Sequence, residues 1–288
     1  MKDSRNRRLR DLLGARKAVL LPGAANALTA RVIEDLGFAA IYVTGAGVTN
    51  TFLGVPDIGL VTVTELANHV GAMREAVDVP LIVDADTGFG NALNVGRTVQ
   101  TLERAGASAI QLEDQDFPKR CGHFSGKSVI PRGEMVQKIR AAVDARNDPD
   151  LVIIARTDAI AVNGFDDAME RAAAYIEAGA DMTFVEAPRS KEQIAAIPVR
   201  LPVPQLINIV AGGLTPMVPR DELENMGYAV ALYANAALQA AVAGMQNVLG
   251  HLKERGSLAG LANELASFDE RQRLVQKPQF DALEKKYS

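Results

Sequence analysis

The chain has 288 residues, of which 48% are hydrophobic, so it can bury one large core. Its 35 acidic and 31 basic residues give a formal net charge of −4, which disfavours a nucleic-acid or membrane-surface protein. No apolar run approaches the ~20 residues of a membrane span. The basic start, residues 1–17, lacks a signal-peptide apolar stretch and predicts an amphipathic helix. The single cysteine, Cys121, excludes an intramolecular disulfide framework, so we expect a cytoplasmic protein.

Short apolar segments recur along the chain, and a helical segment follows each of them. They predict strands at residues 18–24, 39–45, 80–86, 109–115, 151–158, 182–187, 204–210 and 229–234. Most are continuous apolar runs, which is typical of parallel strands covered on both faces. Eight strand–helix units predict one (β/α)₈ TIM-barrel domain over 1–288, with a doubly wound open sheet as the alternative. The charged tail, from about 255 to 288, predicts a C-terminal helical extension.

The predicted helices carry recognisable end signals. Several of them end just before a glycine, which can take the left-handed conformation of a helix C-terminus. These glycines are Gly37, Gly106, Gly179 and Gly227. Thr62 and Glu65 have the spacing of a capping box at a helix start. The longest gaps between strand starts follow the second and fourth strands, so we expect long loops there, on the face where barrel enzymes bind substrate.

Polar residues gather at the C-terminal ends of the predicted strands, although a buried apolar strand has no structural need for them. They are Asp84, Asp86, Glu113, Asp114, Arg156, Asp158, Glu186 and Asn208. In a barrel these ends converge on one pocket, which predicts a shared site. The alternative for any single residue is a helix cap or a solvated loop.

An all-oxygen group is expected within this set. Asp84 and Asp86 alternate by two and therefore point to the same side of the strand. Together with Glu113 they favour Mg²⁺ or Mn²⁺ over zinc, with some contacts made through water. Asp57, in the loop after the second strand, is a candidate for the surrounding shell; the alternative is a simple Pro-Asp turn.

The loop at 117–132 surrounds Cys121 with cationic or histidine side chains, which favour a thiolate and attract an anionic substrate. They are Lys119, Arg120, His123, Lys127 and Arg132. Gly122 and Gly126 would let the loop move as a lid, while the alternative for Cys121 is a small buried hydrophobe. The segment TGAGVT at 44–49 offers backbone N–H groups to a carboxylate but lacks the third glycine of a dinucleotide fingerprint.

Motifs along nearly the whole chain resemble one family. They are YVTGAG (42–47), LGVPDIGL (53–60), VDADTGFGNALNV (83–95), QLEDQ (111–115), KRCGH (119–123), IIARTDA (153–159) and VEA (185–187). The chain resembles the isocitrate lyase/phosphoenolpyruvate mutase superfamily, closest to its branch of 2,3-dimethylmalate lyase-like, methylisocitrate lyase-like and petal death protein-like enzymes. Within this family, KRCGH marks the carbon–carbon lyases.

The resemblance implies roles for the residues singled out above. Mg²⁺ is expected on Asp84 and Asp86, partly through water, with Asp57 and Glu113 around it, and Mn²⁺ as a possible substitute. The groups expected to bind a small carboxylic acid substrate are Thr44, Gly45, Ala46, Gly122, Arg156, Glu186 and Asn208. The catalytic set is Cys121 as general acid, His123, and Tyr42 as one candidate for the hydroxyl base; the other candidate is a carboxylate acting through water. The resemblance further implies a homotetramer that exchanges C-terminal helices.

The expected activity is Mg²⁺-dependent cleavage of a 2-hydroxy dicarboxylic or tricarboxylic acid. A 2-alkylmalate or 2-methylisocitrate would give a 2-oxo acid such as pyruvate and a second carboxylic acid. The alternatives are an oxaloacetate hydrolase, a carboxyphosphonate or phosphonate phosphorylmutase, and a non-catalytic barrel. Ala211, Ala234 and Asn235 depart from the branch, which usually has an acidic residue at the first position and Pro-Leu at the other two; with Phe124 and Phe184 they are expected to shape the distal end of the pocket.

Overall fold

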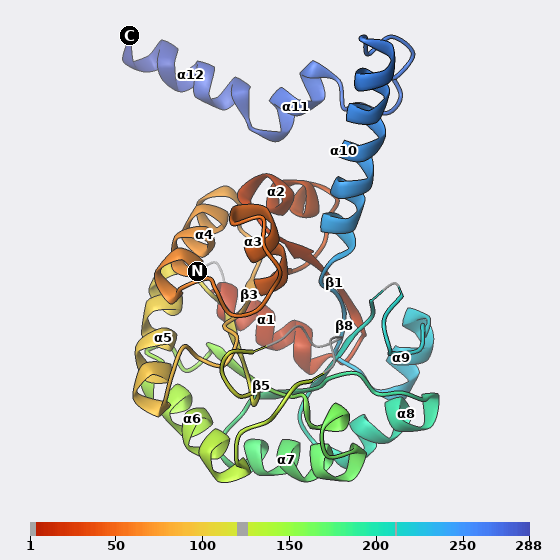
Figure 1. Cartoon of the computed structure of the whole chain (residues 1–288). Coiled ribbons are helices and arrows are strands. Elements are labelled where there is room, and N and C mark those ends of the chain that lie inside the picture. The colour runs from red at the N-terminus through yellow and green to blue at the C-terminus, as the bar shows by residue number, and fades with distance from the viewer. Residues whose placement is uncertain (1–3, 120–125, 211) are drawn as a thin grey trace.

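The fold is a closed barrel of parallel strands paired in chain order (Figure 1). A computed structural model describes residues 4–119, 126–210 and 212–288. The strands are β1 (Val19–Ala24), β2 (Ile41–Val43), β3 (Leu81–Asp84), β4 (Ala109–Glu113), β5 (Val152–Thr157), β6 (Met182–Val185), β7 (Gln205–Asn208) and β8 (Val230–Tyr233). Each lies within its predicted range. Because β8 pairs with β1, from Val19↔Val230 to Pro22↔Tyr233, the open-sheet alternative is wrong.

Helices cover the outside of the barrel (Figure 1). They are α2 (Ala27–Asp35), α4 (Val63–Ala76), α5 (Ala92–Ala105), α6 (Arg132–Ala145), α7 (Phe165–Glu177), α8 (Lys191–Arg200) and α9 (Arg220–Met226). The predicted end signals are confirmed, since Gly37, Gly106, Gly179 and Gly227 all have a positive φ, between 83° and 104°. Thr62 and Glu65 form the predicted capping box at the start of α4.

Two short helices lie in the βα loops. The helix α3 (Gly45–Phe52) occupies the first part of the long loop after β2, where we had predicted only a loop, and a 3₁₀ helix, Ala159–Ala161, follows β5. The two ends of the second long segment, after β4, lie side by side, because Gln115 pairs with Val129 in an antiparallel bridge. Both insertions sit on the C-terminal face, as the strand spacing predicted.

The first helix, α1 (Arg5–Gly14), closes the N-terminal end of the barrel. Its Leu9 and Leu13 are buried in the same apolar cluster as the inward-facing barrel residues Leu21, Ile82 and Phe184. Figure 1 accordingly shows α1 crossing behind the middle of the ring of strands. The prediction of an amphipathic first helix is confirmed, and its apolar face serves as the floor of the barrel.

The arginines of α1 bind backbone carbonyl groups just before the barrel strands. Arg8 donates to the carbonyl of Asp78, at 2.7 Å, ahead of β3. Arg10 donates to the carbonyl of Asp150, at 3.0 Å, ahead of β5, and to the carboxylate of Asp181, at 3.0 Å, ahead of β6. The basic composition of the N-terminal segment therefore serves intramolecular contacts.

The C-terminal helices leave the barrel (Figure 1). They are α10 (Ala236–Arg255), α11 (Phe268–Leu274) and α12 (Lys277–Tyr287), and none of them buries a residue. The projecting part thus begins with α10, about one helix before the predicted boundary near 255. An ion pair of 2.6 Å between Arg273 and Asp35 ties α11 to α2. Within the described ranges, α10 included, no helix combines the length and apolarity needed to cross a membrane.

Replacing Arg10 by alanine tests the role of α1 as the barrel floor. Its guanidinium makes several charge-assisted hydrogen bonds to partly buried groups, so we expect Arg10→Ala to lower the free energy of unfolding by about 2 kcal/mol. Urea denaturation followed by circular dichroism measures this change. Arg7→Ala on the same helix is the control, because Arg7 makes only exposed ion pairs, at 3.4 and 3.9 Å. Equal effects of the two substitutions would contradict the assignment.

Candidate active site

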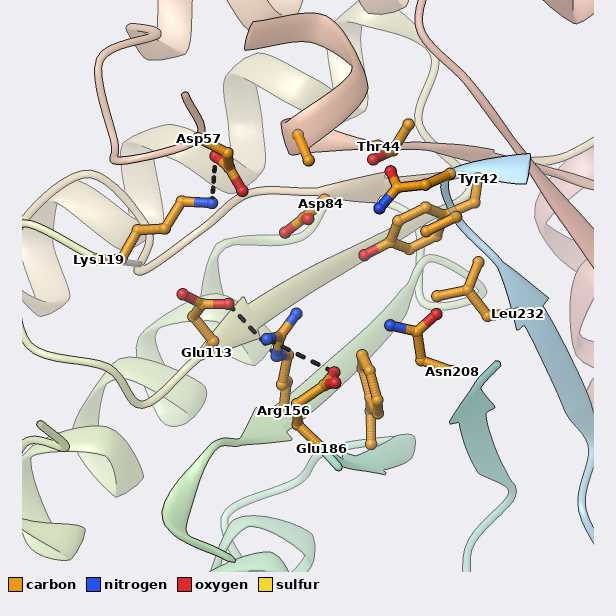
Figure 2. A pocket seen from close by; sticks show the side chains of 14 residues that line it. Tyr42, Thr44, Asp57, Asp84, Glu113, Lys119, Arg156, Glu186, Asn208 and Leu232 are labelled. Atoms are coloured by element: carbon orange, nitrogen blue, oxygen red, sulfur yellow. Dashed lines mark hydrogen bonds and ion pairs between the residues drawn. The ribbon is translucent and has the colours of Figure 1, made fainter. Parts of the chain in front are cut away.

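Most of the predicted site residues come together in one pocket at the C-terminal ends of the strands. The pocket encloses about 440 Å³, part of it open to solvent. Its lining residues are Tyr42, Thr44, Ala46, Asp57, Asp84, Glu113, Lys119, Arg156, Phe184, Glu186, Asn208, Leu232, Ala234 and Asn235 (Figure 2). Since barrel strands run in parallel, residues from β2 to β8 that are far apart in sequence meet here.

Lys119 lies at the centre of the acidic side of the pocket. Its Nζ is 2.6 Å from Oδ1 of Asp57 and 2.8 Å from Oδ1 of Asp86, and only 4% of its side chain is exposed. Figure 2 shows Lys119, Asp57, Asp84 and Glu113 on one side of the cavity. In the sequence, Lys119 is only one of several charges in the loop at 117–132. Its salt bridges depend on tertiary folding, so no local pattern could have revealed them.

The acidic group has the donor chemistry of a magnesium site. An added Cβ on Gly45 would lie 3.2 Å from both Oδ2 of Asp84 and Oδ1 of Asp86, so the two carboxylates face the same side, as predicted, around a backbone without a side chain. Oε1 of Glu113 is buried and has no hydrogen-bond partner among the described residues. No described His, Cys, Asp or Glu side chains form a ready-made group of three ligands.

The protonation of these carboxylates depends strongly on burial. Asp86 follows the end of β3 with a φ of 48°, and burial raises its pKa to about 6, although Lys119 opposes the shift. Burial likewise raises the pKa of Glu113 well above its usual range, against the effect of Arg156. A buried carboxylate without enough positive charge nearby therefore holds a proton in mildly acidic solution. A divalent cation would compete with that proton.

The segment TGAGVT forms the start of α3. Thr44 is the N-cap residue, and its hydroxyl accepts the N–H of Gly47 at 3.2 Å. The first-turn N–H groups of Gly45 and Ala46 have no acceptor within the helix, and they lie at its positive end. The segment expected to cradle a carboxylate is thus a helix N-terminus, and its role in binding stays a prediction. Asp84 lies beside it, across from Gly45.

Arg156 is buried between carboxylates. Its Nε is 2.8 Å from Oδ2 of Asp158 and 3.4 Å from Oε2 of Glu113, and its Nη2 is 3.5 Å from Oε2 of Glu186. The guanidinium also packs over the ring of Phe184, 5.0 Å from its centre. Burial disfavours the charge, but the carboxylates outweigh burial and hold the pKa of Arg156 well above its usual value. Arg156 therefore presents a fixed positive charge to the pocket.

Asp158 supports Arg156 from behind the pocket. Lys127, from the segment after β4, is 2.7 Å from Oδ1 of Asp158, which is fully buried. Burial raises the pKa of Asp158, yet Arg156 and Lys127 together lower it to about 2. The aspartate thus stays ionised and fixes the orientation of the arginine. It does not line the pocket, contrary to our expectation.

Asp114 also points away from the pocket, which corrects the sequence analysis. Its carboxylate accepts hydrogen bonds from the hydroxyl of Thr157 at 2.7 Å, the N–H of Asp158 at 2.9 Å and the hydroxyl of Tyr175 at 2.8 Å. Successive side chains of a strand point to opposite faces, so Glu113 and Asp114 cannot both face inward. Asp114 instead ties the C-terminal ends of β4 and β5 to α7.

Tyr42 is connected to the acidic group through Gln111, which the sequence analysis missed. The Tyr42 hydroxyl donates to Oε1 of Gln111 at 2.9 Å, and Nε2 of Gln111 donates to Oδ1 of Asp84 at 3.1 Å. Burial, followed by the charge of Asp84, raises the pKa of Tyr42 well above 10. The phenol is thus protonated at neutral pH. A glutamine in the middle of an apolar strand was the available signal for this chain of hydrogen bonds.

Cys121, Gly122 and His123 lie outside the described residues, as do Phe124 and Ala211. Their predicted roles stay predictions. Of the nearby described residues, Lys119 binds Asp57 in the pocket and Lys127 binds Asp158 behind it.

Comparison with known proteins adds to this geometry. The family model described as phosphoenolpyruvate phosphomutase matches residues 9–253. A 2,3-dimethylmalate lyase of Eubacterium barkeri is 47% identical over 263 residues, which cover 91% of each chain. This chain belongs to the phosphoenolpyruvate mutase/isocitrate lyase superfamily. A 2-methylisocitrate lyase of Bacillus subtilis is 39% identical over 278 residues, covering 96% of this chain and 91% of that one. These relatives support the prediction of a carbon–carbon lyase.

Solved structures of the superfamily share the fold. A 2,3-dimethylmalate lyase has a TM-score of 0.93 at 33% identity, with 100% of this chain and 97% of that chain covered. An oxaloacetate acetylhydrolase bound to the inhibitor 3,3-difluorooxalacetate has a TM-score of 0.91 at 35% identity, with 97% and 96% covered. A phosphonopyruvate hydrolase in complex with oxalate and Mg²⁺ has a TM-score of 0.89 at 31% identity, with 99% of both chains covered.

A methyl group on Gly45 should weaken metal binding. The new Cβ would crowd Asp84 and Asp86, each 3.2 Å away, and displace them from their shared orientation. We expect Gly45→Ala to lower Mg²⁺ affinity by at least about tenfold, as disturbed ligand orientation commonly does. Isothermal titration calorimetry measures the affinity. Gly71→Ala in α4 is the matched control, because an added Cβ there meets nothing within 4 Å. Unchanged Mg²⁺ affinity in Gly45→Ala would refute this location of the metal site.

Proposed function

We propose that the protein is a Mg²⁺-dependent carbon–carbon lyase acting on a 2-hydroxy dicarboxylic or tricarboxylic acid. Cleavage of a 2-alkylmalate or 2-methylisocitrate would release a 2-oxo acid, such as pyruvate, and a second carboxylic acid. The observation that carries the proposal is that an acidic oxygen-donor group and the buried Arg156 share one pocket with the N-terminus of α3. Such a pocket can bind a metal, a carboxylate and a polarised oxygen at once.

The residues suited to hold Mg²⁺ are Asp84 and Asp86, with Asp57 and Glu113 in the surrounding shell. When bound, the ion would supply positive charge that stabilises negative charge on the oxygen of the 2-oxo acid. Mn²⁺, another cation that prefers oxygen ligands, could substitute. The Mg²⁺ in the related phosphonopyruvate hydrolase structure supports this choice of cation.

The chain itself would bind the carboxylate of the substrate. The N–H groups of Gly45 and Ala46, together with the positive end of α3, suit an anion. Arg156 adds a fixed charge, and its orientation is set by Asp158. Because these groups are held before the substrate arrives, little reorganisation is needed when charge develops.

The reaction can be written with balanced protons. A base removes the proton of the 2-hydroxyl, the C2–C3 bond breaks, and the bonding electrons leave on C3 as a carbanion stabilised by its neighbouring carboxylate. Cys121 donates its thiol proton to that carbon as general acid, assisted by His123, and is reprotonated before the next turnover. Tyr42 is protonated at neutral pH, which favours the alternative base, a carboxylate acting through water.

Hydrolysis of oxaloacetate is the second candidate. The oxaloacetate acetylhydrolase structure is 35% identical to this chain over nearly its whole length, a level similar to that of the lyase structure. In that reaction water attacks the carbonyl carbon, and the products are oxalate and acetate. The two activities therefore differ both in the substrate that they consume and in the products that they release.

A Mg²⁺-dependent assay of a substrate panel tests the proposal. The panel contains 2,3-dimethylmalate, 2-ethylmalate, 2-methylisocitrate, isocitrate, citramalate and oxaloacetate. We expect 2-oxo acid release from at least one 2-hydroxy acid, with loss of activity after chelation of the metal. Cys121→Ser should retain Mg²⁺ binding and lose turnover by about 10²-fold or more, because the hydroxyl is a much weaker acid.

Other outcomes of the panel are equally clear. Oxalate and acetate from oxaloacetate alone would identify the hydrolase, and silence across the panel would refute the lyase. Phosphonopyruvate followed by ³¹P NMR then tests the phosphonate chemistry. Near-normal turnover of Cys121→Ser would refute the acid role of Cys121.

We also propose that the C-terminal helices bind other copies of the chain in a homotetramer. Met245 and Leu249 on α10 are 54% and 59% exposed, and Phe268 and Phe280 beyond it are 68% and 60% exposed. Apolar side chains repeating over several turns of a projecting helix favour a partner surface. A second copy of the chain would cover the same stripe in both partners, as symmetric oligomers do.

A charge on this stripe should break the assembly. We expect Leu249→Glu to sediment as a smaller species than the wild type in analytical ultracentrifugation, because the interface would bury an unpaired carboxylate. Glu254→Lys is the control, an exposed charge change on the same helix. A wild-type chain that sediments as a monomer would refute the tetramer.

A further inference from the structure

Asn235 is a polar residue of the pocket wall. It lies between β8 and α10 and lines the pocket. Its Oδ1 is buried and has no hydrogen-bond partner among the described residues. Buried polar atoms in folded proteins are nearly always paired, so an unpaired one at the wall of a pocket calls for a ligand.

Helix capping does not account for Asn235. It occupies the N-cap position of α10, where asparagine commonly accepts a backbone N–H, but its side chain makes no cap hydrogen bond. Asn26 provides the contrast, because at the N-cap of α2 its side chain accepts the N–H of Thr29 at 2.9 Å. The two backbones differ accordingly, with ψ at 169° for Asn26 and 2° for Asn235. The amide of Asn235 is thus available to the pocket.

The backbone before Asn235 is held in place by a close contact with β1. A Cβ on Gly23 would lie only 1.9 Å from the carbonyl oxygen of Ala234, so this approach requires glycine. Ala234 is itself buried. Because its neighbour is fixed against β1, Asn235 projects from a rigid wall, which is the setting in which a single side chain can discriminate between substrates.

The surroundings of Asn235 combine apolar surface with a second amide. Leu232 and Phe184 contribute the apolar part. Asn208, at the end of the adjacent strand β7, is 9% exposed, and its Oδ1 also lacks a partner within the described ranges. Figure 2 shows Asn208 and Leu232 across the cavity from Lys119 and Asp57. The side chains of this wall are uncharged, although the guanidinium of Arg156 packs over the ring of Phe184.

We infer that Asn235 selects a substrate by the side group on C2, the group that stays on the 2-oxo acid after cleavage. The selected side group carries a hydroxyl where the rejected one carries an alkyl group. This rests on the proposed function and names its substrate class. An amide offers both a donor and an acceptor, and a hydroxyl can pair with either. An alkyl group would leave the buried amide unpaired, which is the basis on which sites built for a hydroxyl reject analogues that lack it.

Binding of two 2-oxo acids of equal size tests the inference. 3-Hydroxypyruvate carries a hydroxyl where 2-oxobutanoate carries a methyl group. In calorimetric titrations with Mg²⁺ present, we expect the wild type to bind 3-hydroxypyruvate at least about tenfold more tightly, the equivalent of one hydrogen bond. Asn235→Leu should lose this preference. Asn235→Asp keeps the size and an acceptor, so it should retain the preference although both anions bind more weakly.

The outcomes separate this inference from the proposed function. A wild type that binds both acids equally, or prefers 2-oxobutanoate, overturns the role of Asn235 while leaving the lyase standing. An unchanged preference in Asn235→Leu overturns it as well. If neither acid binds, the 2-oxo acid pocket itself is wrong, and the proposed function fails with it. Circular dichroism of both variants confirms that they fold.

Discussion

Excess negative charge in a buried pocket is the constraint on which the site depends. Among the described residues, six carboxylates and three cations meet in or just behind this pocket. Lys119 pairs with Asp57 and Asp86, Lys127 pairs with Asp158, Arg156 pairs with Glu113, Asp158 and Glu186, and Asp84 lies beside Gly45. Burying charge without compensation is costly, and a protein relieves it by protonation or by binding a cation. The raised pKa values of Asp86 and Glu113 show the first response. A divalent cation would provide the second, so the charge balance itself favours a metal site.

The barrel makes this concentration of charge possible. One end is closed by α1, whose leucines pack against the inner residues and whose arginines bind the segments before the strands. The C-terminal ends of the strands can then carry residues that repel one another, because the sheet and its helices hold them in position.

The sequence predicted the strands and helix ends well, because these follow from local patterns. Continuous apolar runs marked the strands, and Gly106 and Gly227 marked helix ends through their left-handed backbone. Asp84 and Asp86 were recognised by spacing alone. Alternation along β4 would also have shown that Glu113 and Asp114 diverge. Lys119 pairs with both Asp57 and Asp86, and the side chain of Asn235 makes no cap hydrogen bond to α10. Both features arise from tertiary contacts, which no local sequence pattern contains.

The two walls of the pocket differ in how readily their residues can be replaced by others. On the acidic wall, Lys119 pairs with Asp57 and Asp86 together, so replacing any one of these residues alters the charge balance of the others. The wall at β7 and β8 consists of uncharged side chains, Asn208, Leu232 and Asn235 among them. A substitution at this second wall changes the shape and the hydrogen bonding of the pocket without altering the balance of buried charge. Superfamily members with different named substrates would therefore be expected to differ at this wall while retaining the charged one.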